Sequence, residues 1–535
     1  MTFESNMTWS PQDEAGLRDA IQLLARIPSI TGTAPENEVS KYLADRLRGL
    51  ASPTPSSLVV EQFVAPDTLQ AGVAALYLKP GCKRTVVMLA HTDVVSVDDF
   101  GPYHQEAFDI PNWTHRLRSG EVDLPAEASF DLQRGEWWFG RGVMDMKAGL
   151  ALNLVLFEKA CREGAAGNLV FLAVPDEESH SRGMLAATEL LRRWQETYGL
   201  EYALCLNTEP SFVGSNERTG WHVYSGSFGK MLLGALAIGI PGHVGIPFSG
   251  VSAVQMVTHL AQTLEANPDL SERTDSGGIV PLTCLWLRDL QETYSVQSPH
   301  MAAAFFHVPF FRKSPSQVLS SLGAICQEAM GRLRDWTADR ARQAGMPTPK
   351  HTDHIPVVWL SELMRTSTHS ALRVDPDNLM LGTLDAVRRI ALSHRTAAQA
   401  QVVLFLAPPV YPAVDAADDP LVQRCIHQAQ KRASETFGLD LEHRTAFPGL
   451  CDLSYTGYGL GTDFAAIARE MPVWGNGYSL PLQTMADLAI PVCNLGPFGK
   501  DAHQWTERLD VEYTTRVLPL LSLEVLSEAL RTDVG

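Results

Sequence analysis

The chain has 535 residues, enough for two to four domains with large buried cores. Its 61 acidic and 43 basic residues give a net charge of -18, and without any basic run this charge argues against nucleic acid and anionic membranes as partners. The eight cysteines have no paired spacing, and no signal-like N-terminus or bilayer-length apolar run is visible, so we expect a cytoplasmic protein with reduced cysteines.

The N-terminal segment predicts two helices and then several strands. Ser10 and Pro11 open the first helix, because serine is a favoured cap, proline suits the first position, and Asp13 complements the helix dipole. This helix should end near Arg26. A second helix is predicted over 36–50, and strands over 59–64, 73–78 and 85–91.

Between residues 85 and 209, three short apolar runs each end in an acid or a histidine. Unbroken apolar runs separated by helical patterns predict an α/β fold with a mixed, mainly parallel sheet and helices on both faces. Ligands bind beyond the carboxyl ends of the strands in such sheets, so these side chains should gather at one rim. The residues that follow the runs, or in one case a Gly-rich turn, are His91, Asp93, Asp145, Glu177, Glu178 and Glu209.

One imidazole with several carboxylates is a donor set for Zn²⁺, Mn²⁺ or Co²⁺. A carboxylate can bridge two cations, and two cations roughly 3.5–4 Å apart can polarise a carbonyl and activate water. The adjacent Glu177 and Glu178 can divide the roles of base and ligand. Each signal alone is weak, since paired glutamates after a strand usually belong to a solvated loop; the order and context together favour a metal site.

Residues 96–138 read as a long loop-like insertion that contains His104, Trp113 and His115. A loop of this length inside a compact domain is usually functional or disordered. Because it joins His91 to Asp145, we expect it to hang over the metal rim. Its histidines should face solvent or form hydrogen bonds rather than bind metal.

From about Gly220 the pattern changes to a β-α-β-β-α order, which predicts an α+β lid domain inserted into the catalytic domain. Pro241-Gly242-His243 follows the first strand of this lid. We place the first part of the catalytic domain at 1–219, the lid at 220–400 and the second part at 401–535. The elements predicted here are strands over 230–240, 281–290, 301–308, 401–407 and 490–495 and helices over 251–264, 314–343, 376–398, 421–437 and 511–530.

Five motifs resemble those of the metallopeptidase family that includes glutamate carboxypeptidase, aminoacylase and succinyl-diaminopimelate desuccinylase. AHTDVV, GRGVMDMKAG and PDEES resemble its three ligand motifs, PGHVGIPFSGVSA its lid histidine motif, and GKDAHQWTERL its last ligand motif. The match covers nearly the whole chain, and the longer loop between the first two motifs resembles the RocB-type arginine-utilisation branch. The resemblance implies a zinc-peptidase-like catalytic domain with a lid through which a homodimer can form.

The resemblance also implies a role for each site residue. Asp145 bridges the two metal ions and Glu177 is the general base. Asp93 supports the ligand shell, and His243 meets the oxyanion from the lid, in dimers from the neighbouring subunit. Asp452 resembles a family acid motif, but we assign it to structure. The remaining ligands are His91 and Glu209 for one metal ion and Glu178 and His503 for the other.

The implied function is hydrolysis of a small-molecule amide, either a peptide or an N-acyl amino acid, in arginine or amino-acid catabolism. The cofactors are two divalent metal ions, Zn²⁺ first, with Co²⁺ or Mn²⁺ as alternatives. Two other interpretations stay open: a catalytically silent metal-binding or regulatory protein, and a one-metal deacylase. The presence of Glu177 favours the hydrolase, because a binding protein needs no base beside its ligands.

The chain departs from the family at a lid strand, where many relatives carry Asp-x-Arg and the arginine holds a substrate carboxylate. Here His307-Val308-Pro309 takes that place, with Arg312 nearby. Recognition of a free substrate carboxylate is therefore not predicted. The apolar run 305–311 is interpreted as core.

Overall fold

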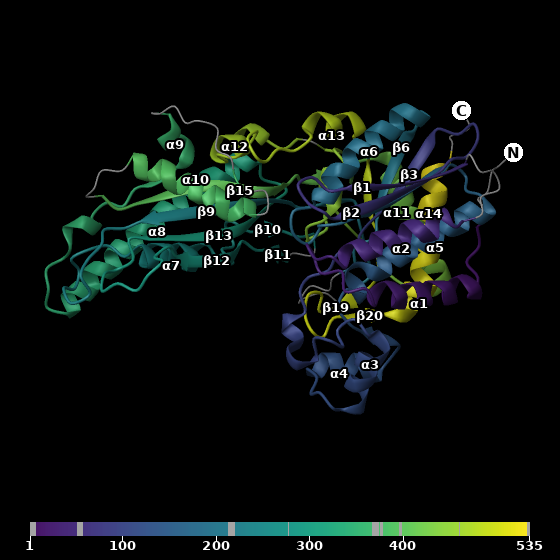
Figure 1. The fold of residues 1–535 in the computed structure, drawn as a ribbon, viewed down its shortest axis with the longest axis horizontal. Coiled ribbons are helices and arrows are strands. Elements are labelled where there is room, and N and C mark those ends of the chain that lie inside the picture. The colour runs from purple at the N-terminus through teal and green to yellow at the C-terminus, as the bar shows by residue number, and fades with distance from the viewer. Residues whose placement is uncertain are drawn as a thin grey trace. The chain divides into compact units, whose positions relative to one another are not determined.

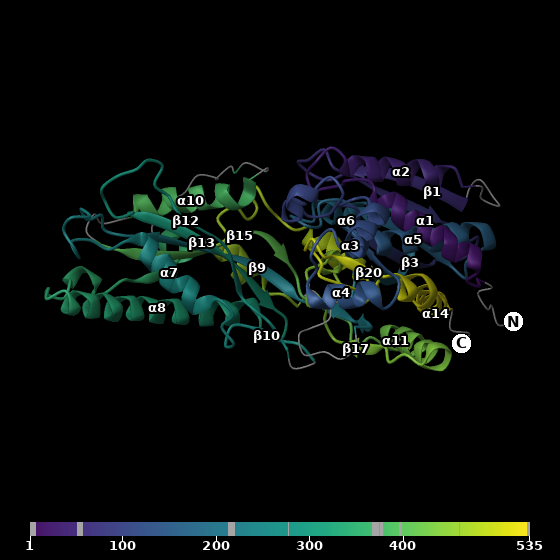
Figure 2. The same ribbon diagram turned by 90° about the horizontal axis from the view of Figure 1, so that it is seen from below.

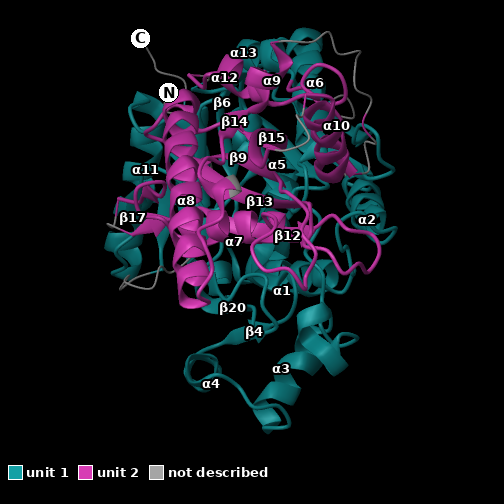
Figure 3. Cartoon of the chain, turned by 90° about the vertical axis from the view of Figure 1, so that its left-hand side faces the viewer, with its two compact units in different colours: residues 1–227, 414–460, 481–535 teal, residues 228–413, 461–480 magenta. Residues whose placement is uncertain are grey.

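The computed structural model describes residues 7–50, 57–211, 220–275, 278–365, 374, 378–394, 399–459 and 461–531. The chain divides into two compact units, which Figure 3 colours separately. Unit 1 comprises Met1–Ser227, Val414–Leu460 and Pro481–Gly535, and unit 2 comprises Phe228–Ala413 and Gly461–Leu480. Among the described helices, none combines the length and the apolar character that crossing a bilayer requires.

This division differs from the boundaries predicted at 219/220 and 400/401. Residues 401–413 belong to unit 2 because the strand that starts at Gln401 pairs along most of its length with the first strand of that unit. The chain also returns to unit 2 at Gly461–Leu480. There the Tyr478 hydroxyl accepts a hydrogen bond from the Val410 backbone N–H, at 2.9 Å.

Unit 1 is built on an eight-stranded sheet in the order β1-β2-β5-β3-β6-β18-β7-β17 (Figure 1). The central strands β5, β3, β6 and β18 are parallel neighbours, whereas β1 and β2 extend one side in antiparallel pairs. The predicted mixed, mainly parallel sheet with helices on both faces is confirmed. Its strands are β1 (Leu58–Val64), β2 (Ala71–Tyr77), β3 (Arg84–His91), β5 (Asn168–Val174), β6 (Glu201–Asn207), β7 (His222–Tyr224), β17 (Glu442–Arg444) and β18 (Val492–Asn494).

The predicted helix starts are present in unit 1. Ser10 caps α1 (Pro11–Ala25) by accepting the backbone N–H of Asp13 at 3.2 Å, and the Asp13 carboxylate accepts the backbone N–H of Ser10 in return. The buried face of each helix packs on the sheet or on another helix, which stabilises both layers. The other helices of the sheet layers are α2 (Glu36–Arg48), α5 (Ala148–Glu163), α6 (Arg182–Tyr198), α11 (Pro420–Arg432), α13 (Leu482–Leu488) and α14 (Leu518–Leu530).

The prediction of a loop over 96–138 is wrong, because this segment folds into short helices. Its buried Trp113 contacts the rings of Phe100 and Tyr103, each at 5.5 Å between centroids, and these rings form a small satellite core. Helices of ten residues or fewer show too little periodicity to be recognised against the polar background. The elements are η2 (Asp98–Tyr103), α3 (Ile110–Ser119), α4 (Ala126–Gln133) and β4 (Trp137–Phe139), the last in a sheet of order β19-β20-β4 with β19 (Gly499–Lys500) and β20 (Arg508–Asp510). The remaining short elements of unit 1 are the π-helical segments η3 (Val143–Lys147), η6 (Ala433–Phe437) and η8 (Tyr513–Val517), the 3₁₀ helix η7 (Asp452–Tyr455) and the strand pair β8 (Gly226–Ser227) and β16 (Val414–Asp415).

Unit 2 contains a five-stranded sheet in the order β12-β13-β9-β15-β14, with α7 and α8 on one face and α10 on the other (Figure 2). Phe305, Phe306 and Val308 of β13 are buried, which confirms the core assignment for most of this run. The ends predicted for the helix over 376–398 lie outside the described residues. The elements are β9 (Gly229–Ile238), α7 (Ala253–Leu264), β10 (Glu272–Arg273), β11 (Ile279–Val280), β12 (Thr283–Asp289), β13 (Met301–Phe310), α8 (Pro315–Gln343), η4 (Lys350–Thr352), β14 (Val357–Trp359), α9 (Leu360–Met364), α10 (Leu379–Ser393), β15 (Gln401–Tyr411) and α12 (Phe464–Glu470).

Candidate metal centre

The carboxyl ends of three parallel strands place the candidate ligands of unit 1 at one rim of its sheet. His91 is the last residue of β3, Glu177 and Glu178 follow β5, and Glu209 follows β6. Since β3 pairs in parallel with both β5 and β6, the three strand ends are adjacent. His91, Glu177 and Glu209 are all buried. The structure therefore brings these residues together as the sequence predicts.

Asp145 lies between two groups of donor atoms. Its Oδ1 is 3.2 Å from His91 Nε2, which is also 3.6 Å from Glu209 Oε1. Its Oδ2 is 3.2 Å from His503 Nε2, which is also 3.1 Å from Glu178 Oε1. In each group, one ligand atom from each residue lies within 4.8 Å of the others. The two oxygens of Asp145 thus face different groups, as a bridging carboxylate requires.

The donor chemistry and spacing of both groups fit a divalent cation. Imidazole nitrogen and carboxylate oxygen bind Zn²⁺ at about 2.0–2.2 Å, which places tetrahedral ligand atoms roughly 3.4 Å apart. The separations of 3.1–3.6 Å around Asp145 match this spacing. His91, Glu177 and Glu178 form a third group that meets the same criterion. Geometry alone therefore leaves Glu177 open as a ligand or a base.

Asp93 holds the loop that carries Glu177 and Glu178 through hydrogen bonds to its backbone. Its two carboxylate oxygens accept the backbone N–H groups of Glu177 and Glu178, each at 3.1 Å, and Oδ2 also accepts the Thr31 hydroxyl. The Asp93 carbonyl oxygen lies 3.0 Å from His91 Nδ1. A carbonyl can only accept, so Nδ1 carries a hydrogen. Burial alone would lower the pKa of His91, but the charge of Glu209 and the hydrogen bond to Asp145 outweigh it and raise this pKa well above its usual value. Nε2 therefore also carries a hydrogen towards Asp145, which a bound cation would replace.

Two buried residues that the sequence analysis did not single out fix the loop around Asp145. Glu507 Oε1 accepts the backbone N–H groups of Met144 and Asp145, at 3.1 and 3.3 Å. Arg141 Nη1 donates to Glu507 Oε2 at 3.0 Å. Both residues occur in motifs quoted above, but no local pattern distinguishes a buried charged residue from a solvated one.

Lys147 is a third buried titratable residue close to the rim. Its Nζ donates to the Ser29 hydroxyl and to the Thr92 carbonyl, which lies between His91 and Asp93 in the chain. Burial lowers the pKa of Lys147 to about 7, against the opposing charges of Asp93 and Glu36. Lys147 thus tethers the segment that carries His91 and Asp93 to the N-terminal part of the chain.

The pKa values of the cluster reflect crowded carboxylates in a buried site. Burial raises the pKa of Glu177 and of Glu209 well above the usual range, and neighbouring acids add to the rise. Burial alone would lower the pKa of His503, but hydrogen bonds to Asp145 and Glu178 outweigh it and raise the pKa to about 11. In the metal-free protein, protons therefore supply positive charge that bound cations would replace.

Asp452 lies in η7 and is buried, with its pKa raised by burial to about 7 and a hydrogen bond to Ser181 that opposes the rise. It belongs to none of the three donor groups among the described residues. His104 is exposed and its Nδ1 is 3.1 Å from the Gly101 carbonyl, so this histidine of the 96–138 segment forms a hydrogen bond as expected.

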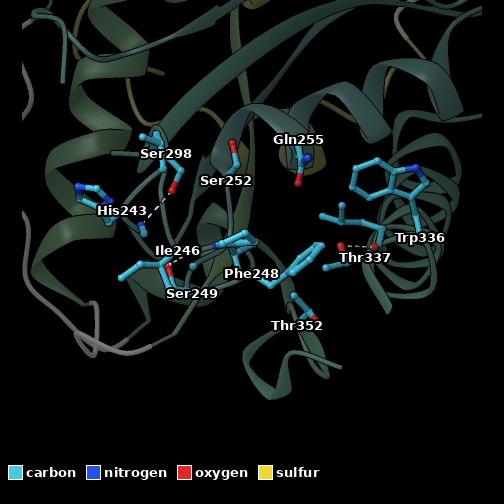
Figure 4. A pocket seen from close by; sticks show the side chains of 16 residues that line it. His243, Ile246, Phe248, Ser249, Ser252, Gln255, Ser298, Trp336, Thr337 and Thr352 are labelled. Atoms are coloured by element: carbon cyan, nitrogen blue, oxygen red, sulfur yellow. Dashed lines mark hydrogen bonds between the residues drawn. The ribbon is translucent and has the colours of Figure 1, made fainter. Parts of the chain in front are cut away.

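His243 lies in unit 2, in an exposed turn after β9. Its Nδ1 accepts a hydrogen bond from the backbone N–H of Gly245 at 3.1 Å. It lines a pocket of about 250 Å³ that also includes Phe248 and Trp336 (Figure 4). The other seven predicted site residues belong to unit 1, and the role of His243 stays a prediction.

Comparison with solved structures shows the fold. A tripeptidase from Staphylococcus aureus gives a TM-score of 0.54 at 14% identity, covering 97% of this chain and 99% of that one. The dipeptidase Dug1p from Saccharomyces cerevisiae gives 0.55 at 13% identity, covering 98% of both. At these identities the likeness concerns the fold alone.

Sequence comparison shows the family. The protein YqjN of Bacillus subtilis is 33% identical over 543 residues, 98% of each chain, and RocB of the same organism is 28% identical over 528 residues, 93% of this chain and 92% of RocB. A succinyl-diaminopimelate desuccinylase of Methylorubrum extorquens is 29% identical over 251 residues, 46% of this chain and 56% of the relative. The family model for Peptidase family M20/M25/M40 matches residues 119–474. The resemblance predicted from the motifs is confirmed, and the chain belongs to the M20/M25/M40 peptidase family.

Proposed function

We propose that this chain is a hydrolase that cleaves the amide bond of a small peptide or an N-acyl amino acid, using two divalent cations and a water molecule. The observation that carries the proposal is the position of Asp145, whose two oxygens face the donor groups of His91 and of His503. Zn²⁺ is the first candidate because imidazole and carboxylate suit it, with Co²⁺ and Mn²⁺ as alternatives. Bound there, two cations supply Lewis acidity that polarises a carbonyl and lowers the pKa of water.

Glu177 is the proposed general base. It accepts a proton from the attacking water and delivers it to the leaving nitrogen. Its burial and its raised pKa support this role, because such a carboxyl can hold a proton between the two steps. Asp93 holds the Glu177 backbone N–H at 3.1 Å, which supports a fixed position for the base.

His243 is proposed to donate a hydrogen bond to the oxyanion when unit 2 closes over the substrate. A homodimer formed through unit 2 would allow this histidine to act on the partner's site. The exposed position of His243 and its accepting Nδ1 support the role, since Nε2 is then left as the donor. We also keep the proposal of a cytoplasmic protein, which rests on the cysteine pattern.

We propose that no positively charged side chain of the lid strand β13 takes part in recognising the substrate. His307 is half-buried, and burial together with the charge of Lys230 lowers its pKa to about 3, so the imidazole is neutral at physiological pH. Arg312 forms an ion pair with Asp275 at 3.1 Å. The 28% identity to RocB makes arginine-derived amides and peptides the first compounds to test.

The test is a substrate screen on metal-depleted protein reloaded with Zn²⁺, Co²⁺ or Mn²⁺. Dipeptides and N-acyl amino acids, including arginine derivatives, are incubated with the wild type and with Glu177→Gln. The proposal expects hydrolysis only in the reloaded wild type. Binding of two cations without hydrolysis of any compound would favour a metal-binding or regulatory protein, and binding of one cation with hydrolysis would favour a one-metal deacylase.

A further inference from the structure

The two donor groups are supported by different parts of unit 1. His91 is at the end of a central strand of the large sheet and its side chain is 1% exposed. His503 instead lies in the loop between β19 and β20, with a side chain that is 48% exposed and a left-handed backbone at φ 66°. A ligand on such a loop needs support from outside the loop to keep one position. We call the segment Gly499–Asp510, formed by β19, β20 and this loop, the His503 hairpin.

The segment 96–138, which we call the insertion, leads directly into the sheet that carries this hairpin. Strand β4 pairs antiparallel with β20, so that Phe139 lies opposite Arg508 and Trp137 opposite Asp510. In Figures 1 and 2, α3 and α4 lie close to β20. The strand β4, at the end of the insertion, therefore completes the three-stranded sheet that contains the hairpin.

A buried cation joins α4 to the loop of the hairpin. The Arg508 side chain is 0% exposed, its Nε donates to Asp131 Oδ2 of α4 at 2.8 Å, and its Nη1 donates to Asp501. Lys500 Nζ contacts the same Asp131 at 3.1 Å. A buried arginine is stable only when it is paired, so Asp131 and Asp501 are held in place through Arg508. Asp501 is two residues before His503.

The insertion contacts the other side of the loop as well. Asp99 accepts Arg141 Nη2 at 2.7 Å, and the same guanidinium lies 3.4 Å from the carbonyl oxygen of His503. The rings of Trp113 and Trp505 meet edge to face at 6.3 Å between centroids. Contacts from the insertion thus reach residues before and after His503, and they reach His503 itself through Arg141.

We propose that the insertion is a clamp that positions His503, with Asp131 as the positioning residue that acts through Arg508. The clamp would set the affinity for the cation held by Asp145, Glu178 and His503, and leave the cation held by His91, Asp145 and Glu209 largely unaffected. This inference rests on the proposed function for the presence of the cations. The positioning of the hairpin does not depend on them.

The test compares three variants of the full-length protein. Asp131→Asn removes the charge that Arg508 and Lys500 share, and Asp131→Glu keeps it. Glu106→Gln is the matched control, because Glu106 pairs with Arg116 at 2.7 Å inside the insertion. Each metal-free protein is titrated with Zn²⁺ by calorimetry, and the bound metal is counted by elemental analysis.

Asp131→Asn should weaken one of the two binding steps by about tenfold, the lower end of the range for residues that orient ligands. The other step, and both steps in Asp131→Glu and Glu106→Gln, should match the wild type. Combining Asp131→Asn with His503→Ala should cost no more than His503→Ala alone, since both changes act on one site. Equal losses at both steps, or an unchanged titration, would overturn the proposal.

Hydrogen exchange on the metal-free proteins gives a second measurement that needs no cation. Amides of residues 499–508 should exchange faster in Asp131→Asn than in Glu106→Gln, while those of β3 should not change. If the wild type binds no Zn²⁺, the proposed function fails, and unchanged exchange in Asp131→Asn would separately refute the clamp. If Asp131→Asn does not fold, Asp99→Asn replaces it. The Asp99 side chain is 35% exposed, so its substitution should destabilise the fold less. Unchanged exchange and titration in Asp99→Asn would then refute the clamp.

Discussion

Glu177→Gln is the change that separates the two roles open to this residue. Asparagine would shorten the side chain, whereas glutamine keeps its length and removes only the ability to accept a full proton. The main chain should not move, since the Glu177 backbone N–H is held by Asp93 Oδ1 at 3.1 Å. Glu177 is 8% exposed, and a buried amide at this position can form hydrogen bonds with the polar groups around it. We therefore expect the variant to fold and to bind the same number of cations as the wild type, which is two under the proposed function.

Activity should fall steeply. Loss of a general base costs about a hundredfold to ten-thousandfold in rate, or about 2.7–5.4 kcal/mol of activation free energy. The assay is kcat on the best substrate of the screen, measured with saturating Zn²⁺, together with elemental analysis of the same sample. The matched control is Glu178→Gln, the same change one residue on, which should instead reduce the number of bound cations.

Two results would refute this reasoning. Wild-type kcat in Glu177→Gln would remove it as the base. Loss of one cation in Glu177→Gln as well as in Glu178→Gln would show that Glu177 is a ligand, as in the group His91, Glu177 and Glu178. The metal contents of the two variants therefore decide whether Glu177 is a metal ligand or the base, a choice that the geometry leaves open.

Three further predictions use the same preparations. His91→Ala and His503→Ala should each lower the metal content and the melting temperature, because a ligand that binds only the folded state stabilises it by about 2.7 kcal/mol at a hundredfold excess over its Kd; two cations per chain in both variants would contradict the ligand assignment. His243→Ala should lower kcat by about a hundredfold to a thousandfold with unchanged metal content, and mixing it with Glu177→Gln should restore some activity if the histidine acts across a dimer; an unchanged kcat in the single variant would exclude it. Glu507→Gln should lower the melting temperature and the affinity for both cations, by about tenfold to a hundredfold, as measured by calorimetric titration, because Asp145 belongs to both groups; wild-type titration would show that its loop needs no such support.

The part of the centre that follows the strands was predictable from sequence. An unbroken apolar run predicts a buried parallel strand. His91, Glu177 and Glu209 stand at the ends of such runs, and the carboxyl ends of parallel strands lie together at one rim of the sheet. Asp145 and His503 follow no long strand. Asp145 was placed from the Gly-rich turn before it, whereas its bridging role and the place of His503 were inferred from family motifs. The capped start of α1 was predictable for a similar local reason, because its signals lie within four residues of each other.

The rest depends on contacts between segments far apart in the chain. Glu507 accepts a hydrogen bond from the backbone N–H of Asp145, which is 362 residues away in the chain. The sequence around this glutamate is polar and does not indicate such a partner. The helices α3 and α4 are stabilised by burying Trp113 and by pairing Asp131 with Arg508, neither of which appears in local periodicity. The return of Gly461–Leu480 to unit 2 is likewise set by packing against distant strands.

Asp93 and Glu507 act in the same way on different loops of the centre. Asp93 accepts the backbone N–H groups of Glu177 and Glu178, and Glu507 accepts those of Met144 and Asp145. Each loop is thus held through its main chain by an acid that belongs to none of the three donor groups among the described residues. None of the side chains of Glu178, Asp145 and Glu177 is needed to hold its own loop by these contacts, so they would be available for the roles proposed above, two as metal ligands and Glu177 as the base. A centre built this way keeps its ligand oxygens positioned before metal arrives, which reduces the ordering that binding must impose.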